Sequence, residues 1–218
     1  MAVTAGILAR GPWQPSDIDV TWRAEPFQPP GPVIEEADRA LEALRGRGSP
    51  SHDGLAGRLV EFSAANGKLH LDCEPIRWAL RLLPGNAMQS LSALCVVRRP
   101  DGSWLAGRRA AWLATWAERW ALGAAGSVEV GENPTHTLVR ELHEEWSVEP
   151  ERLTIEALVK LPNGIAMLVG MAWLPDGAVV TPDEEHDAFA WWPPDPARWP
   201  ADADDPLKRI AALLSPAP

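Results

Sequence analysis

Apolar residues recur along the chain with two spacings, one typical of helices and one typical of strands. Across 33–45 they recur every three or four positions, which predicts a helix that begins after Pro32 and stops at Gly46. Across 58–74 they alternate on both sides of Asn66-Gly67, a pair that accepts the positive φ angles of a tight turn. The first pattern therefore indicates a helix and the second a β-hairpin.

The second half of the chain alternates between buried strands and amphipathic helices. Segment 76–83 fits either a short helix or a strand, and the pattern becomes clear only beyond residue 90. A mixture of strands with few helices indicates an α/β or α+β sandwich. The predicted strands cover 91–99, 103–110, 152–161, 165–174 and 188–192, with helices at 134–145 and from Pro206 onward.

The first part of the chain is expected to be an extension of the second. Residues 1–32 are rich in Pro, Asp and small residues and are predicted to be irregular, and 46–54 is a polar linker. We therefore divide the chain into an N-terminal extension (1–85) and a main domain (86–218). A lone helix and a hairpin cannot close a core of their own, so the extension should pack on the main domain or on a second subunit, which leaves a homodimer open.

Composition excludes several classes of partner. The formal net charge is −10, which argues against binding polymeric nucleic acid or an anionic membrane. The longest apolar run, 165–174, is too short to span a bilayer, and the N-terminus lacks the basic region of a secretory signal. With only two cysteines, Cys73 and Cys95, no disulfide framework is expected. These features together favour a cytoplasmic protein with reduced thiols.

The segment from Gly126 to Val148 carries the strongest chemical signal. Glu141, Glu144 and Glu145 stand at i, i+3 and i+4, so their carboxylates share one face of the predicted helix. Such a face is most often simply solvated. Like charges this close nevertheless repel one another, and a hard divalent cation such as Mg2+ takes carboxylate ligands.

The spacing of the fixed positions extends this signal beyond the three glutamates. Gly126 is followed after five residues by Glu132, and after seven more by Arg140-Glu141-Leu142-x-Glu144-Glu145. The segment resembles the Nudix box, G-x5-E-x7-R-E-U-x-E-E-x-G-U, in which U is aliphatic. Ser147 stands where the family has Gly, and Val148 fills the last aliphatic position.

The resemblance implies a Nudix-type α/β/α sandwich with a mixed sheet and the hydrolysis of a nucleoside diphosphate linked to another moiety. It implies that Glu141, Glu144 and Glu145 bind Mg2+ or Mn2+, with Glu144 and Glu145 catalytic and a backbone carbonyl of Gly126 as a further ligand. Glu132 and Arg140 should form a structural pair. Looser likeness reaches from residue 90 to 214.

Three residues outside the box are candidates for the same site. Glu185 resembles a late glutamate that serves some family members as a metal ligand or general base, although it also fits a solvated turn. Arg109 lies on a predicted strand and is our candidate for a phosphate contact. A surface arginine without a role in binding fits the pattern equally well. Trp120 is a candidate for stacking on a nucleobase, although packing is the commoner role of tryptophan.

Two other functions remain open at this stage. A non-catalytic nucleotide or nucleotide-sugar binding module would suit Ser147 and the long extension, whereas the intact carboxylates argue against it. An isopentenyl-diphosphate isomerase-like activity is less favoured, because the segment before the box has no Cys. In each case the partner is a small diphosphate-containing molecule.

Overall fold

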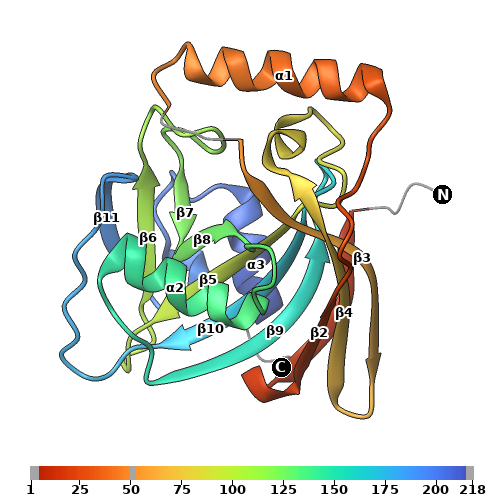
Figure 1. Ribbon diagram of the computed structural model, residues 1–218. Helices are drawn as coiled ribbons and strands as arrows, with labels where there is room; N and C mark the ends of the chain where they lie inside the picture. The colour runs from red at the N-terminus through yellow and green to blue at the C-terminus, as the bar shows by residue number, and fades with distance from the viewer. Residues whose placement is uncertain (1–4, 50–52, 215–218) are drawn as a thin grey trace.

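A mixed β-sheet forms the centre of the protein (Figure 1). The computed structural model describes residues 5–49 and 53–214. The sheet runs in the order β1-β9-β10-β5-β6-β11, with β7 paired to β6 and β8 to β5. Its strands are β1 (Gly6–Trp13), β5 (Leu91–Arg98), β6 (Trp104–Arg109), β7 (Trp120–Leu122), β8 (Ala124–Ser127), β9 (Arg152–Lys160), β10 (Ala166–Trp173) and β11 (His186–Trp192).

A second, three-stranded sheet and the helices surround the central sheet (Figure 1). The second sheet has the order β2-β4-β3, with β2 parallel to β4 and β3 antiparallel to it. Its strands are β2 (Ile18–Trp22), β3 (Leu55–Ala65) and β4 (Lys68–Arg77). The helices are α1 (Gly31–Arg45), α2 (Pro134–Trp146) and α3 (Asp205–Leu214), and short 3-10 turns are η1 (Pro15–Asp17), η2 (Trp78–Leu82) and η3 (Pro196–Arg198).

Strand β5 shows why the architecture is layered. Its residues are buried on both faces, and successive side chains point to opposite sides. Cys95 and Val97 belong to the core that contains Leu138 of α2, whereas Leu94 and Val96 belong to the core that contains α3. The sheet therefore lies between α2 and α3, which confirms the predicted α/β/α sandwich with a mixed sheet.

The predicted helix and hairpin of the extension are both present. Helix α1 begins at Gly31 and ends at Arg45, and it buries its apolar stripe against η2 and the end of β4. Strands β3 and β4 meet at Asn66 and Gly67, whose φ angles are 53° and 77°. Both turn residues are therefore in the left-handed region, as a type I′ turn requires.

The prediction that residues 1–32 are irregular is wrong for most of the described part of that segment, which contains β1, η1 and β2, and holds for 23–30. Strand β1 pairs antiparallel with β9, from Gly6 opposite Lys160 to Trp13 opposite Ile155, at the edge of the central sheet. An edge strand tolerates a proline, because one side of it makes no ladder bonds. The pairing partner lies far along the chain, so local composition gave no signal for it. Residues 1–4, and 50–52 of the predicted linker, lie outside the described residues.

The extension shares its core with the central sheet. Trp13, Leu69, Leu71 and Cys73 are buried in the same apolar cluster as the α2 face of β5. The backbone N–H of Gly57 donates to the carbonyl of Val128 at 2.7 Å, which joins β3 to the loop before α2. The boundary near residue 85 remains a prediction, but the two parts pack as neighbours. None of the helices within 5–49 and 53–214 is long and apolar enough to cross a bilayer.

We expect the extension to be required for stability. Leu71→Ala removes a fully buried side chain from the shared core and should lower the free energy of unfolding by about 2–5 kcal/mol. The same hairpin offers Phe62→Ala as a control, since Phe62 is 37% exposed and should cost much less. Chemical denaturation measures both variants.

A chain that begins at Gly85 should lose solubility or cooperative unfolding, because it exposes the apolar face that β4 covers. Equal stability of this shortened chain and the full chain would contradict a shared core.

Candidate active site

Helix α2 positions the acidic residues, and local sequence explains its start. The side chain of Asn133 accepts the N–H of Thr135 and so caps the helix, and Pro134 occupies the first turn, where a missing N–H costs nothing. Leu138, Leu142 and Trp146 are fully buried along one stripe. That stripe fixes the rotation of the helix, which turns the carboxylates of Glu141 and Glu145 toward β8.

The helix ends at Ser147 in a left-handed conformation. Ser147 has φ 55° and ψ 37°, and its N–H donates to the carbonyl of His143 at 2.9 Å. The Nudix box has Gly at this position because glycine adopts this conformation without steric cost. The serine keeps the same geometry and its side chain is exposed, so the departure from the box changes the stability of the turn and leaves the acidic face in place.

Glu145 is the most deeply buried of the three glutamates. One carboxylate oxygen accepts the N–H of Ala125 at 2.9 Å. The other oxygen is buried without a hydrogen-bond partner and lies 3.6 Å from Nε2 of His186, which also has no partner. Burial raises the pKa of Glu145 well above its ordinary value, despite the hydrogen bond from Ala125. The site thus holds a carboxylate oxygen that is out of water and unsatisfied.

Glu141 lies against the backbone of β8. A Cβ atom on Gly126 would clash with the Glu141 carboxylate, because it would lie 2.0 Å from the Cδ atom. Only glycine therefore fits at position 126. Oε1 of Glu141 accepts a hydrogen bond from Arg140 at 2.7 Å. Burial raises the pKa of Glu141 to about 7, with Glu144 and Glu185 adding to the rise and Arg140 opposing it.

Arg140 connects the acidic residues to the loop before the helix. Its Nε lies 3.2 Å from Oε1 of Glu132, and its Nη2 donates to the carbonyl of Ser127 at 3.2 Å. Burial alone would raise the pKa of Glu132, but Arg140, Thr137 and the N–H of Glu129 together hold it below the ordinary value. The structure therefore brings the expected pair, Glu132 and Arg140, into contact.

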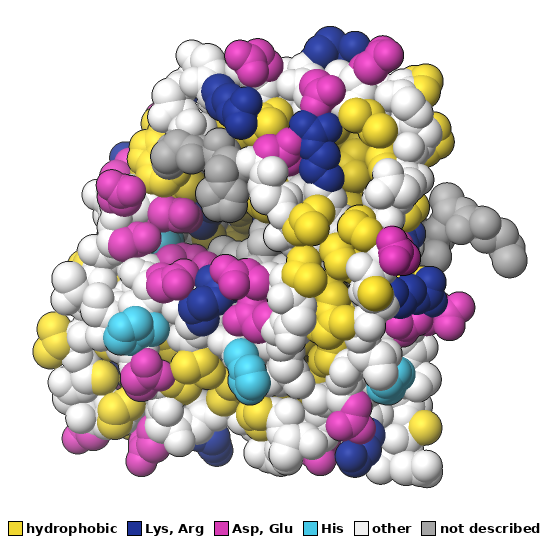
Figure 2. Space-filling model, viewed as in Figure 1, with side chains coloured by type: hydrophobic (Ala, Val, Ile, Leu, Met, Phe, Trp, Pro, Cys, Tyr) yellow, Lys and Arg dark blue, Asp and Glu magenta, His cyan; other side chains and the backbone are white. Residues whose placement is uncertain are grey.

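Glu144 is the most exposed of the three glutamates. Its carboxylate lies 3.0 Å from Nη1 of Arg140, the same nitrogen that binds Glu141. In the described part of the chain, no three acidic, histidine or cysteine side chains are gathered as a ready-made metal site. The guanidinium of Arg140 supplies the positive charge between two of the carboxylates. Figure 2 shows acidic side chains gathered over α2, with basic side-chain atoms among them.

Two candidates from outside the box also lie in this region. Arg109 is half-buried, and its Nη2 lies 3.4 Å from Oε2 of Glu185, whereas Arg108 points outward and pairs with Asp187 at 2.7 Å. Burial raises the pKa of Glu185, and the charge of Arg109 opposes that rise. Arg109 and Glu185 thus join β6 to the start of β11 beside the acidic helix.

The structure does not bring Trp120 to the carboxylates. Its ring packs against Trp192 with centroids 5.4 Å apart, next to the core on the α3 side of the sheet. The preceding segment is irregular rather than a helix that would align Trp112, Trp116 and Trp120. A stacking role for Trp120 in this site therefore has no geometric support.

Two residues of the site carried little signal in the sequence. His186 is buried between Trp146, whose ring lies 4.4 Å away, and Glu145, and a Cβ on Gly107 would meet it at 2.3 Å. In the sequence, His186 stood out only as the neighbour of Glu185. Arg81 comes from η2, in the segment whose secondary structure the pattern left open, and the side chain reaches Ser127.

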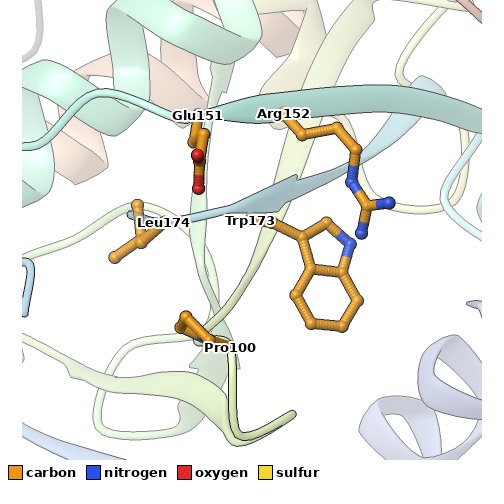
Figure 3. Close-up of a pocket in the computed structure, with 5 residues that line it drawn as sticks. All are labelled: Pro100, Glu151, Arg152, Trp173 and Leu174. Atoms are coloured by element: carbon orange, nitrogen blue, oxygen red, sulfur yellow. The ribbon is translucent and has the colours of Figure 1, made fainter. Parts of the chain in front are cut away.

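A surface hollow elsewhere on the molecule does not contain this chemistry. It has a volume of about 320 Å³ and lies at the ends of β5 and β10 (Figure 3). Arg152 extends over the ring of Trp173, 4.9 Å from its centroid, with a single carboxylate, Glu151, nearby. None of the residues that line this hollow belongs to the acidic cluster, so it is not the candidate active site.

Comparison with known proteins identifies the class of protein. The NUDIX domain model matches residues 88–214, more than half of the chain, and the chain therefore belongs to the Nudix family. Membership supports hydrolysis of pyrophosphate bonds, with divalent metal ions as the usual cofactors of the family. A search of curated proteins found no match.

Several solved structures are similar to part of this chain at low sequence identity. A MutT protein from Methanosarcina mazei Go1 is 21% identical, with 58% of this chain and 96% of that chain covered and a TM-score of 0.45. A MutT NUDIX hydrolase from Burkholderia pseudomallei is 20% identical, with 58% and 98% covered and a TM-score of 0.47. The NUDIX domain of Shewanella oneidensis NrtR, solved with ADP ribose, is 18% identical, with 58% and 89% covered and a TM-score of 0.46.

The raised pKa of Glu141 predicts how its ionisation affects stability. Because the folded pKa of about 7 lies above the ordinary value of 4.5, folded Glu141 keeps its proton where the unfolded chain loses it. Ionisation of Glu141 therefore lowers the stability of the folded protein by nothing below about pH 4.5 and by its full amount above about pH 7. Without metal ions, Glu141→Gln should match the wild type near pH 4.5 and be more stable at pH 8, by on the order of 2–3 kcal/mol.

Thermal unfolding in EDTA from pH 4.5 to 8 measures this difference. The control is Glu151→Gln, which removes an exposed carboxylate outside the cluster and should follow the wild type at every pH. Parallel curves for Glu141→Gln and the wild type would show that Glu141 ionises freely in the folded protein.

Ser147 provides a separate test of the helix end. Ser147→Gly should raise the free energy of unfolding by about 0.5–1 kcal/mol, because it removes a left-handed non-glycine residue. Ser147→Ala keeps that backbone cost and should bring no gain. Denaturant unfolding of the two variants separates backbone strain from any role of the hydroxyl, and equal stabilities would refute the strain.

Proposed function

We propose that this protein hydrolyses a nucleoside diphosphate linked to another moiety by Mg2+- or Mn2+-dependent cleavage of the pyrophosphate bond. The supporting observation is that buried Glu145 and half-buried Glu141 lie together against β8, within electrostatic reach of half-buried Glu185. Perturbed carboxylates of this kind are concentrated at functional sites.

A divalent cation fits the residues of this cluster. Glu141, Glu144 and Glu145 would hold it, with the carbonyl of Gly126 as a further ligand. The unsatisfied buried oxygen of Glu145 and the raised pKa of Glu141 both fit carboxylates whose charged form a divalent ion would stabilise. When bound, such an ion polarises the phosphoryl group and makes an attacking water more acidic.

The other side chains divide the remaining tasks. Glu185 is the favoured proton acceptor, because its raised pKa lies closer to neutral pH than that of an exposed carboxylate. Glu144 is the second candidate. Arg109 binds a phosphate of the substrate, and the Glu132–Arg140 pair holds the loop 127–133 against α2.

Neutralising Glu145 should abolish activity without harming the fold. Glu145→Gln keeps an oxygen that accepts from Ala125 but removes the charge, and kcat should fall by about 100-fold or more. The same change removes the cost of a buried charge, so the metal-free variant should unfold at a higher temperature than the wild type. Phosphate release and thermal unfolding measure the two effects, with Glu151→Gln as the control.

The substrate screen covers nucleoside triphosphates, ADP-ribose, nucleotide sugars and dinucleotides, each with Mg2+ and with Mn2+. Unchanged turnover by Glu145→Gln at saturating Mg2+ would overturn the assignment of this carboxylate. Binding of nucleotides by the wild type without any turnover would instead favour a non-catalytic binding module.

A further inference from the structure

Arg81 brings a positive charge from the extension to the candidate active site. It belongs to η2, outside the residues 88–214 that match the family. Its Nη1 donates to Oγ of Ser127 in β8, and its Nη2 donates to Oγ of Ser92 in β5 at 3.3 Å. The carbonyl oxygen of Ser127 also accepts a hydrogen bond from Arg140, so the guanidinium groups of Arg81 and Arg140 both contact this residue.

The position of Ser127 places Arg81 beside the acidic cluster. Ser127 directly follows Ala125 and Gly126, which contact Glu145 and Glu141. Burial lowers the pKa of Arg81 to about 10, the charges of Glu141 and Glu185 oppose that shift, and Arg109 adds to it. Arg81 therefore lies within electrostatic reach of all three of these residues.

The contacts of Arg81 in the described part of the chain include no anion, although its guanidinium lies over the ring of Trp78, 5.6 Å from the centroid. Arg58 contacts Glu74 at 2.5 Å and Arg109 contacts Glu185 at 3.4 Å, whereas half-buried Arg98 donates to the carbonyl of Gly102. Within 5–49 and 53–214, Arg81 has no carboxylate within 4 Å, and its hydrogen bonds go to neutral hydroxyl groups. A guanidinium taken out of water without an anion is costly, and a planar fork of donors suits phosphate.

We propose that Arg81 is a substrate-binding residue that the extension supplies, and that it binds a phosphate of the diphosphate group together with Arg109. This inference rests on the proposed function, since it names a contact within that site. It also gives the extension a chemical role, because the shared core alone would only require apolar side chains.

The test compares Arg81 with an arginine of similar burial in the same extension. Arg58 is held by Glu74 and by the carbonyl of Met88, so its contacts are accounted for within the protein. Titration calorimetry of the full chain measures binding of ADP, and separately of inorganic pyrophosphate, in the presence of Mg2+. Arg81→Met should weaken both by about 10- to 100-fold. Arg81→Lys should recover part of the affinity, and Arg58→Met should change it less than twofold while lowering the Tm.

Each outcome decides the assignment. If Arg81→Met unfolds, Arg81→Lys and Arg81→Gln take its place, and a higher affinity of the lysine variant supports the charge contact. If Arg81→Met keeps the wild-type affinity but has a lower Tm, Arg81 is purely structural and the proposal is overturned. A loss of affinity for ADP without a loss of affinity for pyrophosphate would also overturn it. So would a wild-type protein that binds neither ligand. If the wild-type protein binds ADP and pyrophosphate through Arg81 but shows no turnover, the proposed hydrolysis is refuted and the role of Arg81 in binding stands.

Discussion

The contact of one guanidinium with several carboxylates makes the rest of this site possible. Helix α2 places three glutamates on one face, which would repel one another in isolation. Arg140 touches Glu132, Glu141 and Glu144 at once, and its pKa is raised by these contacts although burial alone would lower it. The helix, the preceding loop and strand β8 are therefore held together by electrostatics as well as by the apolar stripe beneath them.

The compensation is incomplete where the helix meets the sheet. Arg140 reaches Glu141 and Glu144, but Glu145 faces Ala125 and His186, where its second oxygen stays unsatisfied. A fold under selection for stability alone would place a neutral side chain there. The structure instead keeps an ionisable carboxyl group, with its pKa raised by burial, at a position that Arg140 does not contact, and a divalent ion would stabilise the charged form there.

The accuracy of the sequence-based predictions depended on whether the determining interactions were local. Helix α2, its acidic face and the turn at Asn66-Gly67 depend on neighbours a few residues away, and all were predicted. Strand β1 depends on β9, and Arg81 on Ser127, so no local pattern revealed either. Trp120 shows another limit of sequence-based prediction. A tryptophan near the Nudix box has the same sequence signal whichever face of the sheet it covers.

The pairing of β1 with β9 also bears on the order in which the chain acquires its structure. Strand β1 leaves the ribosome before its partner β9, which is made roughly 150 residues later, a delay of about 7–30 s at typical rates of synthesis. During that time β1 has no strand to pair with, and an unpaired strand invites association with other chains. Pro12 within β1 removes one ladder donor and so limits such pairing. The nascent chain thus completes the edge of its central sheet late, after the acidic helix has already emerged.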